Sequence, residues 1–150
     1  TVLTLSYAHF GLAADGSPVV FRVRPFLHPV GNIAARKRIV DLSLYQGDED
    51  YFPIFFTPAL NPYDRIGIRD GVEGRPPRVD FLTYPERTGG RVDFVLTWRL
   101  DAARRDDPWV GSVLRQLEAG YEPIYWSPRG WVEVWRRRGF SRRASSRPAA

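Results

Sequence analysis

The chain has 150 residues and a formal net charge of +5, and 43% of its residues are hydrophobic and 14% aromatic. This length suits one domain, and the apolar content suffices for a core, which argues against a disordered chain. The absence of cysteine excludes disulfides, thiolate catalysis and cysteine-bound metals. No apolar run approaches the ~20 residues of a membrane-spanning helix.

The positive charge is concentrated at the C-terminus. Residues 136–150 hold six arginines and no acid, whereas residues 1–135 hold 16 bases and 17 acids, a net charge of −1. We therefore expect one electrically balanced globular domain over residues 1–138 and a basic, disordered tail over residues 139–150. Nucleic-acid-binding domains normally carry positive charge on the folded surface, so this distribution argues against nucleic acid as a partner.

Two features of composition concern the origin of the chain. Arginine outnumbers lysine 21 to 1, a bias typical of GC-rich coding sequences, from which we infer a bacterial source. The chain contains no methionine and begins with Thr1. We therefore expect a processed chain or a piece of a longer protein.

Three extended segments are predicted in the first part of the chain. Apolar residues in the stretch 2–7 indicate a strand, and a β-branched run at 19–23 follows a turn signal at 15–18. Residues 51–56 are apolar and aromatic, which predicts a buried extended segment, and Pro53 places it at an edge or a bend.

A helix is predicted between these segments. Asn32 can cap its N-terminus, and the helix is expected to run to about Leu44. Ile33, Val40 and Leu44 would then lie on one side, with basic residues on the wet side.

A long loop and a short repeat follow. Residues 57–77 contain four prolines and three glycines, and loops of this length are often functional or mobile. Tyr63 and Asp64 in this loop are candidate ligand-binding residues. The sequence Arg-Val-Asp-Phe occurs at 78–81 and again at 91–94, and each copy is predicted to begin a strand of a hairpin that turns between 85 and 90.

The C-terminal part gives the clearest pattern. Residues 92–98 read as a strand covered on both faces. Asp107 is a plausible N-cap, Pro108 fits the first helical position, and Gly120 is expected to end the helix in the left-handed conformation. Two further strands are predicted to flank a turn at residues 127–130.

These elements together predict the fold class. A strand–helix–strand unit implies a right-handed parallel crossover, and the last strand should pair antiparallel with its predecessor. We therefore expect a single-domain α/β (or α+β) protein with a mixed β-sheet, a C-terminal antiparallel hairpin and about two main helices.

The sequence carries no recognisable catalytic or metal-binding motif. His9 and His28 stand in unrelated contexts, and residues 47–50 lack the ligand spacing of a calcium loop. We therefore assign no catalytic residue, no metal and no cofactor. Asp80 and Asp93 could act as a carboxylate pair, but structural pairing with Arg78 and Arg91 is the favoured interpretation.

The aromatic residues around the C-terminal turn are the other candidate site. Such side chains can stack on sugar rings or bases, or lie at a membrane interface. Alternation places Tyr125 and Trp126 on opposite faces, so part of the set should pack in the core, and packing is favoured over a ligand surface. The candidate ligand-binding residues are Tyr125, Trp126, Trp131, Tyr63 and Asp64.

Several short motifs carry a resemblance to a known family. They are Asn32 to Arg38, DLSLYQ at 41–46, DYFP at 50–53, VDFVLTW at 92–98, YEPI at 121–124 and SPRG at 127–130. Over about residues 30–138 the chain resembles the soluble C-terminal portions of bacterial multi-pass membrane glycosyltransferases of the GT-C type. In that family the catalytic acids belong to the membrane part, so the resemblance assigns no catalytic residue here.

The resemblance implies a non-catalytic soluble accessory domain on the extracytoplasmic side of the bacterial cell membrane. Such a domain would assist acceptor or carbohydrate binding, or assembly at the membrane surface. Its partners would be the membrane part of the same polypeptide, a carbohydrate or lipid-linked sugar acceptor, and anionic lipid through the arginine-rich tail. The alternatives are a small stand-alone enzyme that uses carboxylates, and a nucleic-acid-binding protein that uses the tail.

Overall fold

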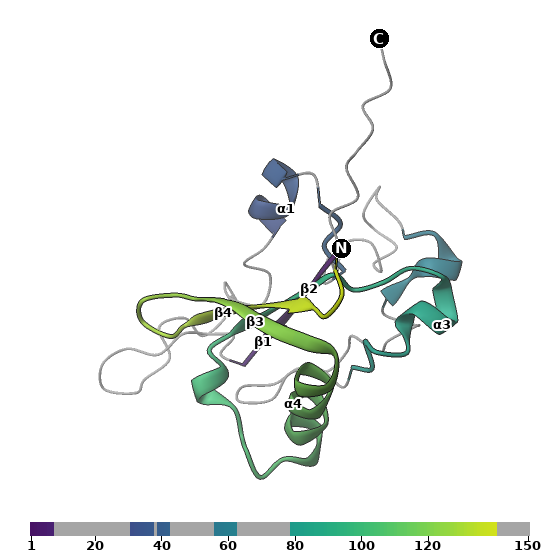
Figure 1. Ribbon diagram of the computed structural model, residues 1–150. Helices are drawn as coiled ribbons and strands as arrows, with labels where there is room; N and C mark the ends of the chain where they lie inside the picture. Colours follow the sequence, from purple (N-terminus) through teal and green to yellow (C-terminus); the bar gives the residue numbers. More distant parts are fainter. Residues whose placement is uncertain (8–30, 38, 43–55, 63–78, 141–150) are drawn as a thin grey trace, which may run out of the picture.

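The computed structural model describes residues 1–7, 31–37, 39–42, 56–62 and 79–140 (Figure 1). Their elements, in chain order, are β1 (Val2–Ser6), α1 (Gly31–Lys37), the 3-10 helix η2 (Pro58–Leu60), α3 (Tyr84–Thr88), β2 (Phe94–Trp98), the 3-10 helix η3 (Leu100–Ala102), α4 (Pro108–Gly120), β3 (Tyr121–Trp126) and β4 (Val132–Arg137).

The four strands form one mixed sheet in the order β1-β2-β4-β3. β1 pairs parallel with β2, and β4 pairs antiparallel with both β2 and β3. Because β2 and β3 are each antiparallel to β4, they run in the same direction, and α4 connects them as a crossover. The predicted α/β class, mixed sheet and C-terminal hairpin are therefore confirmed.

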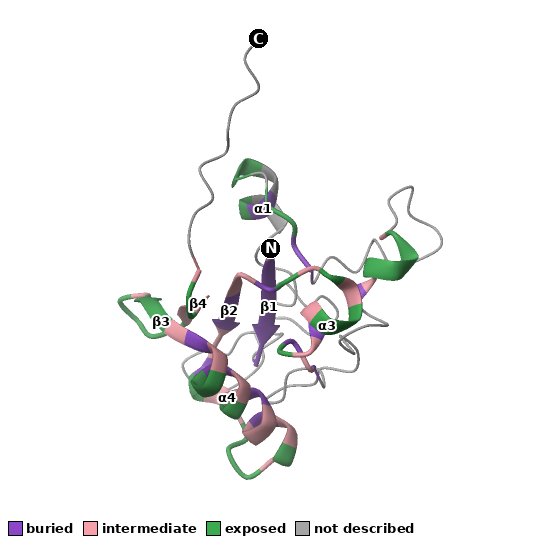
Figure 2. Ribbon diagram, turned by 45° about the vertical axis from the view of Figure 1, so that its right-hand side comes forward, coloured by how far each residue is buried: buried purple, intermediate pink, exposed green. Residues whose placement is uncertain are grey.

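The core lies between the sheet and α4. Val110, Val113 and Leu117 recur at helical spacing and are buried, together with Leu3 and Val95 of the two parallel strands. Figure 2 shows β1 buried along its length. Burial of each such side chain contributes about 1.5–3 kcal/mol, so this layer fixes the position of α4 against the sheet.

The start of α4 follows local chemistry. Asp107 Oδ1 accepts a hydrogen bond from the backbone N–H of Trp109 at 2.8 Å, and Pro108 is the first helical residue. Both predictions are confirmed. The end is different, because Gly120 remains helical and Tyr121 is already extended. A Cβ on Gly120 would lie 2.5 Å from Leu82 Cδ2, so glycine serves close packing here and the predicted left-handed residue is wrong.

The N-terminal helix is shorter than predicted. It begins at Gly31, so Asn32 lies inside it, and it ends at Lys37. The next residues pair with β1 instead: Val2 N donates to Val40 O, and Leu42 N donates to Val2 O, both at 2.9 Å. Ile33 is 49% exposed and Val40 55%, whereas the prediction placed both on the apolar side of the helix.

The hairpin predicted for residues 78–94 is also wrong. Tyr84–Thr88 forms α3, and residues 79–81 are not in a strand. Gln116 of α4 takes the hydrogen bonds that a neighbouring strand would make: its Nε2 donates to Val79 O and its Oε1 accepts from Phe81 N, both at 2.9 Å. The residues from Val79 to Phe81 are therefore held by a helix side chain.

Several predictions fall outside the described residues. They are the strand at 19–23, the extended segment at 51–55, most of the loop at 57–77, and the tail from residue 141. His9, His28, Leu44 and residues 47–50 also lie outside. In the part of the chain that is described, no helix has the length and hydrophobicity to span a bilayer.

Candidate functional site: an aromatic tip and a basic pocket

The β3–β4 hairpin ends in a cluster of exposed side chains, here called the aromatic tip: Ile124, Tyr125, Trp126, Arg129 and Trp131. Tyr125 is 49% exposed, Trp126 56% and Trp131 42%. The favoured packing interpretation is therefore wrong for these three, although it holds for Tyr121, which is buried. Large aromatic side chains at such exposure on one turn are available to a ligand or an interface.

Backbone hydrogen bonds fix the turn that carries the aromatic tip. Gly130 N donates to Ser127 O at 2.8 Å, and Gly130 has a φ of 69°, a conformation that glycine adopts without strain. Ser127 Oγ accepts from Val132 N at 3.0 Å. The predicted turn at 127–130 is thus confirmed, and it holds the two strands in a defined register.

The aromatic tip presents side chains on both faces of the hairpin. The register shifts between Pro123 and Tyr125, so that Tyr125 lies opposite Val134 and Trp126 opposite Glu133. Successive strand residues point to opposite faces of a sheet. Tyr125 and Trp126 therefore flank the hairpin on opposite sides, as the sequence predicts.

Two arginines make cation–π contacts with the ring of Trp131. The guanidinium carbon of Arg129 lies 5.5 Å from its ring centroid, and that of Arg99 lies 5.8 Å away, within the range of cation–π attraction. The ring also meets Trp98 edge-on at 6.5 Å. Arg99 itself pairs with Asp101 at 2.8 Å, and these hydrogen bonds hold the pKa of the Asp101 carboxyl below its ordinary value.

Arg99 has a φ of 55°, unusual for a residue with a side chain. Its backbone N–H donates to Trp131 O at 2.7 Å, so the base of the aromatic tip is tied to the end of β2. A left-handed non-glycine residue costs roughly 1–2 kcal/mol, which neighbouring contacts must offset. The strained backbone of Arg99 therefore lies at the point where η3 joins the aromatic tip.

A polar cluster lies on the α4 side of the sheet near the same end. Thr97 of β2 pairs with Glu133 of β4, and Tyr7 follows β1 on the face shared by Leu5 and Thr97. Within the described part of the chain the hydroxyls of Tyr7 and Thr97 are buried without a hydrogen-bond partner. Burial raises the pKa of the Tyr7 phenol well above its ordinary value.

Burial also raises the pKa of the Glu133 carboxyl. The Nε1–H of Trp135, which donates to Glu133 Oε2 at 3.2 Å, opposes that shift only in part. Sequence reasoning missed this cluster, because strand register rather than any motif brings its members together.

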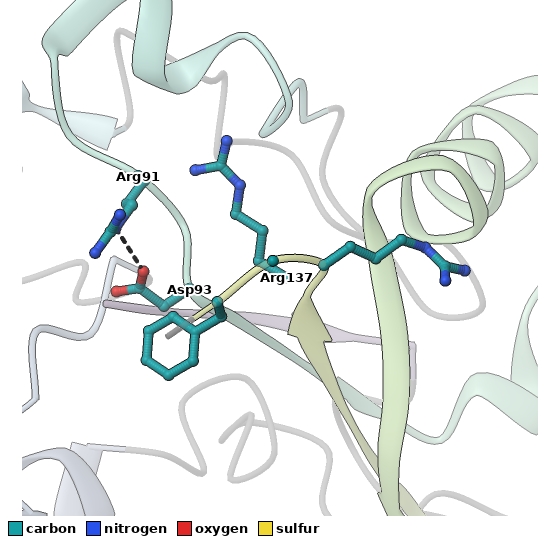
Figure 3. A pocket seen from close by; sticks show the side chains of 6 residues that line it. Arg91, Asp93 and Arg137 are labelled. Atoms are coloured by element: carbon teal, nitrogen blue, oxygen red, sulfur yellow. Dashed lines mark ion pairs between the residues drawn. The ribbon is translucent and has the colours of Figure 1, made fainter. Parts of the chain in front are cut away.

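A basic pocket lies at the end of the sheet opposite the aromatic tip, where β2 begins and β4 ends. Figure 3 shows this pocket from close by. It has a volume of about 200 Å³. Its lining residues are Arg91, Asp93, Arg137, Arg138, Gly139 and Phe140. Asp93 Oδ1 pairs with Arg91 Nε at 2.9 Å, and Arg137 N donates to Asp93 O at 2.9 Å. No motif in the sequence indicates this pocket.

The two carboxylates considered for catalysis each have a local partner. Asp93 pairs with Arg91, as predicted. Asp80 lies 4.0 Å from Arg87 and accepts from Thr83 N at 3.3 Å, whereas Arg78 is outside the described residues. Each carboxylate therefore pairs with a different neighbour.

The remaining predicted site residues, Tyr63 and Asp64, lie outside the described residues. Among the residues that are described, no group of three or more metal-ligating side chains comes together. Comparison of the chain with protein-family models, curated proteins and solved structures gives no match.

Proposed function

We propose that this chain is a non-catalytic accessory domain that docks on the surface of a bacterial membrane through the aromatic tip. One observation carries the proposal: Tyr125, Trp126 and Trp131 are 42–56% exposed on the two sides of a single tight turn. Ile124, at 44% exposure, adds apolar surface to the same turn.

The chemistry of the aromatic tip suits a lipid–water interface. Tyrosine and tryptophan prefer this zone because each has an apolar ring with a polar edge. Arg129 lies beside Trp131, so its guanidinium group can reach a lipid phosphate while the ring lies among the acyl chains. Each arginine near an anionic surface contributes about 1 kcal/mol to binding.

The arrangement of the side chains favours lipid over a carbohydrate platform. A flat sugar ring stacks best on aromatic rings that share one face, whereas the register sends Tyr125 and Trp126 to opposite faces. A two-sided turn matches insertion into a fluid layer, where both faces are covered at once. Carbohydrate binding at this turn is accordingly the weaker reading.

The wider context comes from the resemblance of residues 30–138. It supports attachment to the membrane part of a GT-C type glycosyltransferase, on the extracytoplasmic side, where the domain would help to place a carbohydrate or lipid-linked acceptor. The local ion pairs of Asp80 and Asp93 support the non-catalytic role.

The proposal is tested by binding to lipid vesicles. Wild-type protein should sediment with phosphatidylcholine–phosphatidylglycerol vesicles, with a blue shift of tryptophan fluorescence. A variant carrying Trp126→Ser and Trp131→Ser should lose at least about tenfold in partitioning, because about 1.4 kcal/mol corresponds to a factor of ten. Leu60→Ser is the matched control, since Leu60 is 42% exposed at a distant position.

Two outcomes would overturn the assignment. Unchanged partitioning of the double variant would remove the aromatic tip from the interaction. Loss of all binding on changing Arg142, Arg143 and Arg147 to glutamine, with the double variant unaffected, would assign binding to the tail. Circular dichroism of each variant establishes that the fold is retained.

A further inference from the structure

The basic pocket and the aromatic tip occupy opposite ends of the sheet. Asp93 precedes β2 and Arg137 ends β4, whereas Arg99, beside Trp131, follows β2. Six residues of strand at ~3.3 Å each place the two sites roughly 20 Å apart. A ligand of the pocket is therefore recognised independently of whatever the aromatic tip contacts.

The pocket carries more positive charge than its single acid balances. Arg91 uses Nε to pair with Asp93, which leaves its Nη donors for another acceptor. Arg138 Nη2 donates weakly to Glu118 O at 3.4 Å. Within the described residues the Arg137 side chain makes no hydrogen bond or ion pair, and Figure 3 shows it pointing away from Asp93.

Size and wall chemistry restrict what could fill this space. A volume of about 200 Å³ is below the ~300–1,000 Å³ of sites for drug-sized ligands, which suits a small anion or the charged end of a larger molecule. Phe140 forms one apolar wall, held edge-on by Phe94 with ring centroids 5.2 Å apart.

We propose that the basic pocket binds the phosphate or carboxylate group of a small soluble molecule between Arg137 and Arg91. Guanidinium groups match the planar, two-oxygen geometry of these anions. Asp93 acts as a positioning residue, because its ion pair with Arg91 Nε at 2.9 Å holds that guanidinium beside the pocket. The choice of a soluble ligand rests on the proposed function, since a membrane at the aromatic tip leaves the pocket roughly 20 Å from it.

The test is an NMR titration with inorganic phosphate and with acetate, in chloride buffer of matched ionic strength and without vesicles. The backbone amides of Gly139 and Phe140 should shift saturably. Arg137→Gln and Arg91→Gln should each weaken binding by at least about tenfold, and Arg137→Lys should retain part of it, because lysine keeps the charge without the paired donors. Thermal unfolding establishes that each variant folds.

Arg129→Gln is the matched control, because Arg129 is an exposed arginine of the aromatic tip. It should leave anion binding unchanged, and Arg137→Gln should leave vesicle binding unchanged, so the two proposals fail separately. Equal weakening by Arg129→Gln would reveal nonspecific attraction and overturn the site. So would the absence of amide shifts, and a response to phosphatidic acid vesicles without one to free phosphate would overturn the soluble ligand.

Discussion

At the scale of single residues, Glu133 is the clearest case of a carboxyl group whose surroundings disfavour its charged form. It lies opposite buried Thr97 on one side and Trp126 on the other. Burial raises the pKa of its carboxyl, although Arg105 and the Trp135 indole favour the charged form. The folded protein therefore binds the Glu133 proton more tightly than the unfolded chain does.

This shift fixes the sign of a pH effect. A raised pKa in the folded state contributes stability below the unfolded value of ~4.3, and that contribution is lost as the pH rises through the folded value. Glu133→Gln removes this loss of stability at higher pH, and the glutamine oxygen can still accept the hydrogen bond from Trp135 Nε1. The variant should therefore be more stable than wild type near neutral pH, and the difference should shrink below about pH 4. Urea unfolding at both pH values measures it, and a variant that is less stable only near neutral pH would contradict the assignment.

At the scale of elements, Gln116 joins α4 to residues 79–81 through two hydrogen bonds of 2.9 Å. Removing the amide leaves the Phe81 N–H and the Val79 carbonyl without a hydrogen-bond partner, and both groups have little access to water. Gln116→Met should therefore destabilise the protein by about 2 kcal/mol and accelerate hydrogen exchange at the Phe81 amide. Arg115→Met, at the exposed neighbouring position, should do neither. Equal unfolding free energies for the two variants would show that the two hydrogen bonds of Gln116 contribute nothing to stability.

The elements also show what a sequence can reveal. The cap at Asp107, the proline at 108 and the turn at 127–130 were predictable, because each depends on residues close in the chain. The end of α1 was not, since it is set by pairing with Val2. The sequence predicts Gly120 as a left-handed helix end, but the reason for a glycine there is close contact with Leu82, which is far away in sequence.

The candidate sites divide in the same way. Tyr125, Trp126 and Trp131 were recognisable as a group because they flank one turn, but their exposure depends on what the sheet leaves uncovered. The basic pocket required β4 to join β2, which brings Arg137 beside Asp93. No spacing rule links those positions, so only the fold reveals the pocket.

At the scale of the whole molecule, two buried tyrosines set a limit on stability in alkali. Tyr7 and Tyr121 are almost completely buried, and burial raises the pKa of both phenols well above the ordinary value. Both must be neutral in the folded state, so their contribution is present below the unfolded pKa of ~10 and is lost as the pH rises further. They anchor separate parts of one core, and Tyr121 also donates to Val92 O at 2.9 Å.

Replacement of Tyr7 tests this limit most cleanly, because its hydroxyl has no hydrogen-bond partner in the described structure. Tyr7→Phe should leave stability at pH 7 equal or higher, and it should reduce the fall in unfolding free energy between about pH 8 and about pH 11. Tyr121→Phe should cost about 1 kcal/mol at neutral pH through its lost bond. Denaturant melts followed by circular dichroism measure both, and a large loss at neutral pH for Tyr7→Phe would contradict this account.

The strand order has a further consequence for how the molecule is assembled. β4 is the last strand of the described chain, yet it lies between β2 and β3 in the sheet. During synthesis, β1 and β2 can pair and α4 can form, but β3 lacks its one neighbour among the described strands until residues 132–137 leave the ribosome. The sheet therefore closes from its middle in a late step, and the exposed edges of β2 and β3 are the surfaces that a nascent chain must keep from intermolecular pairing.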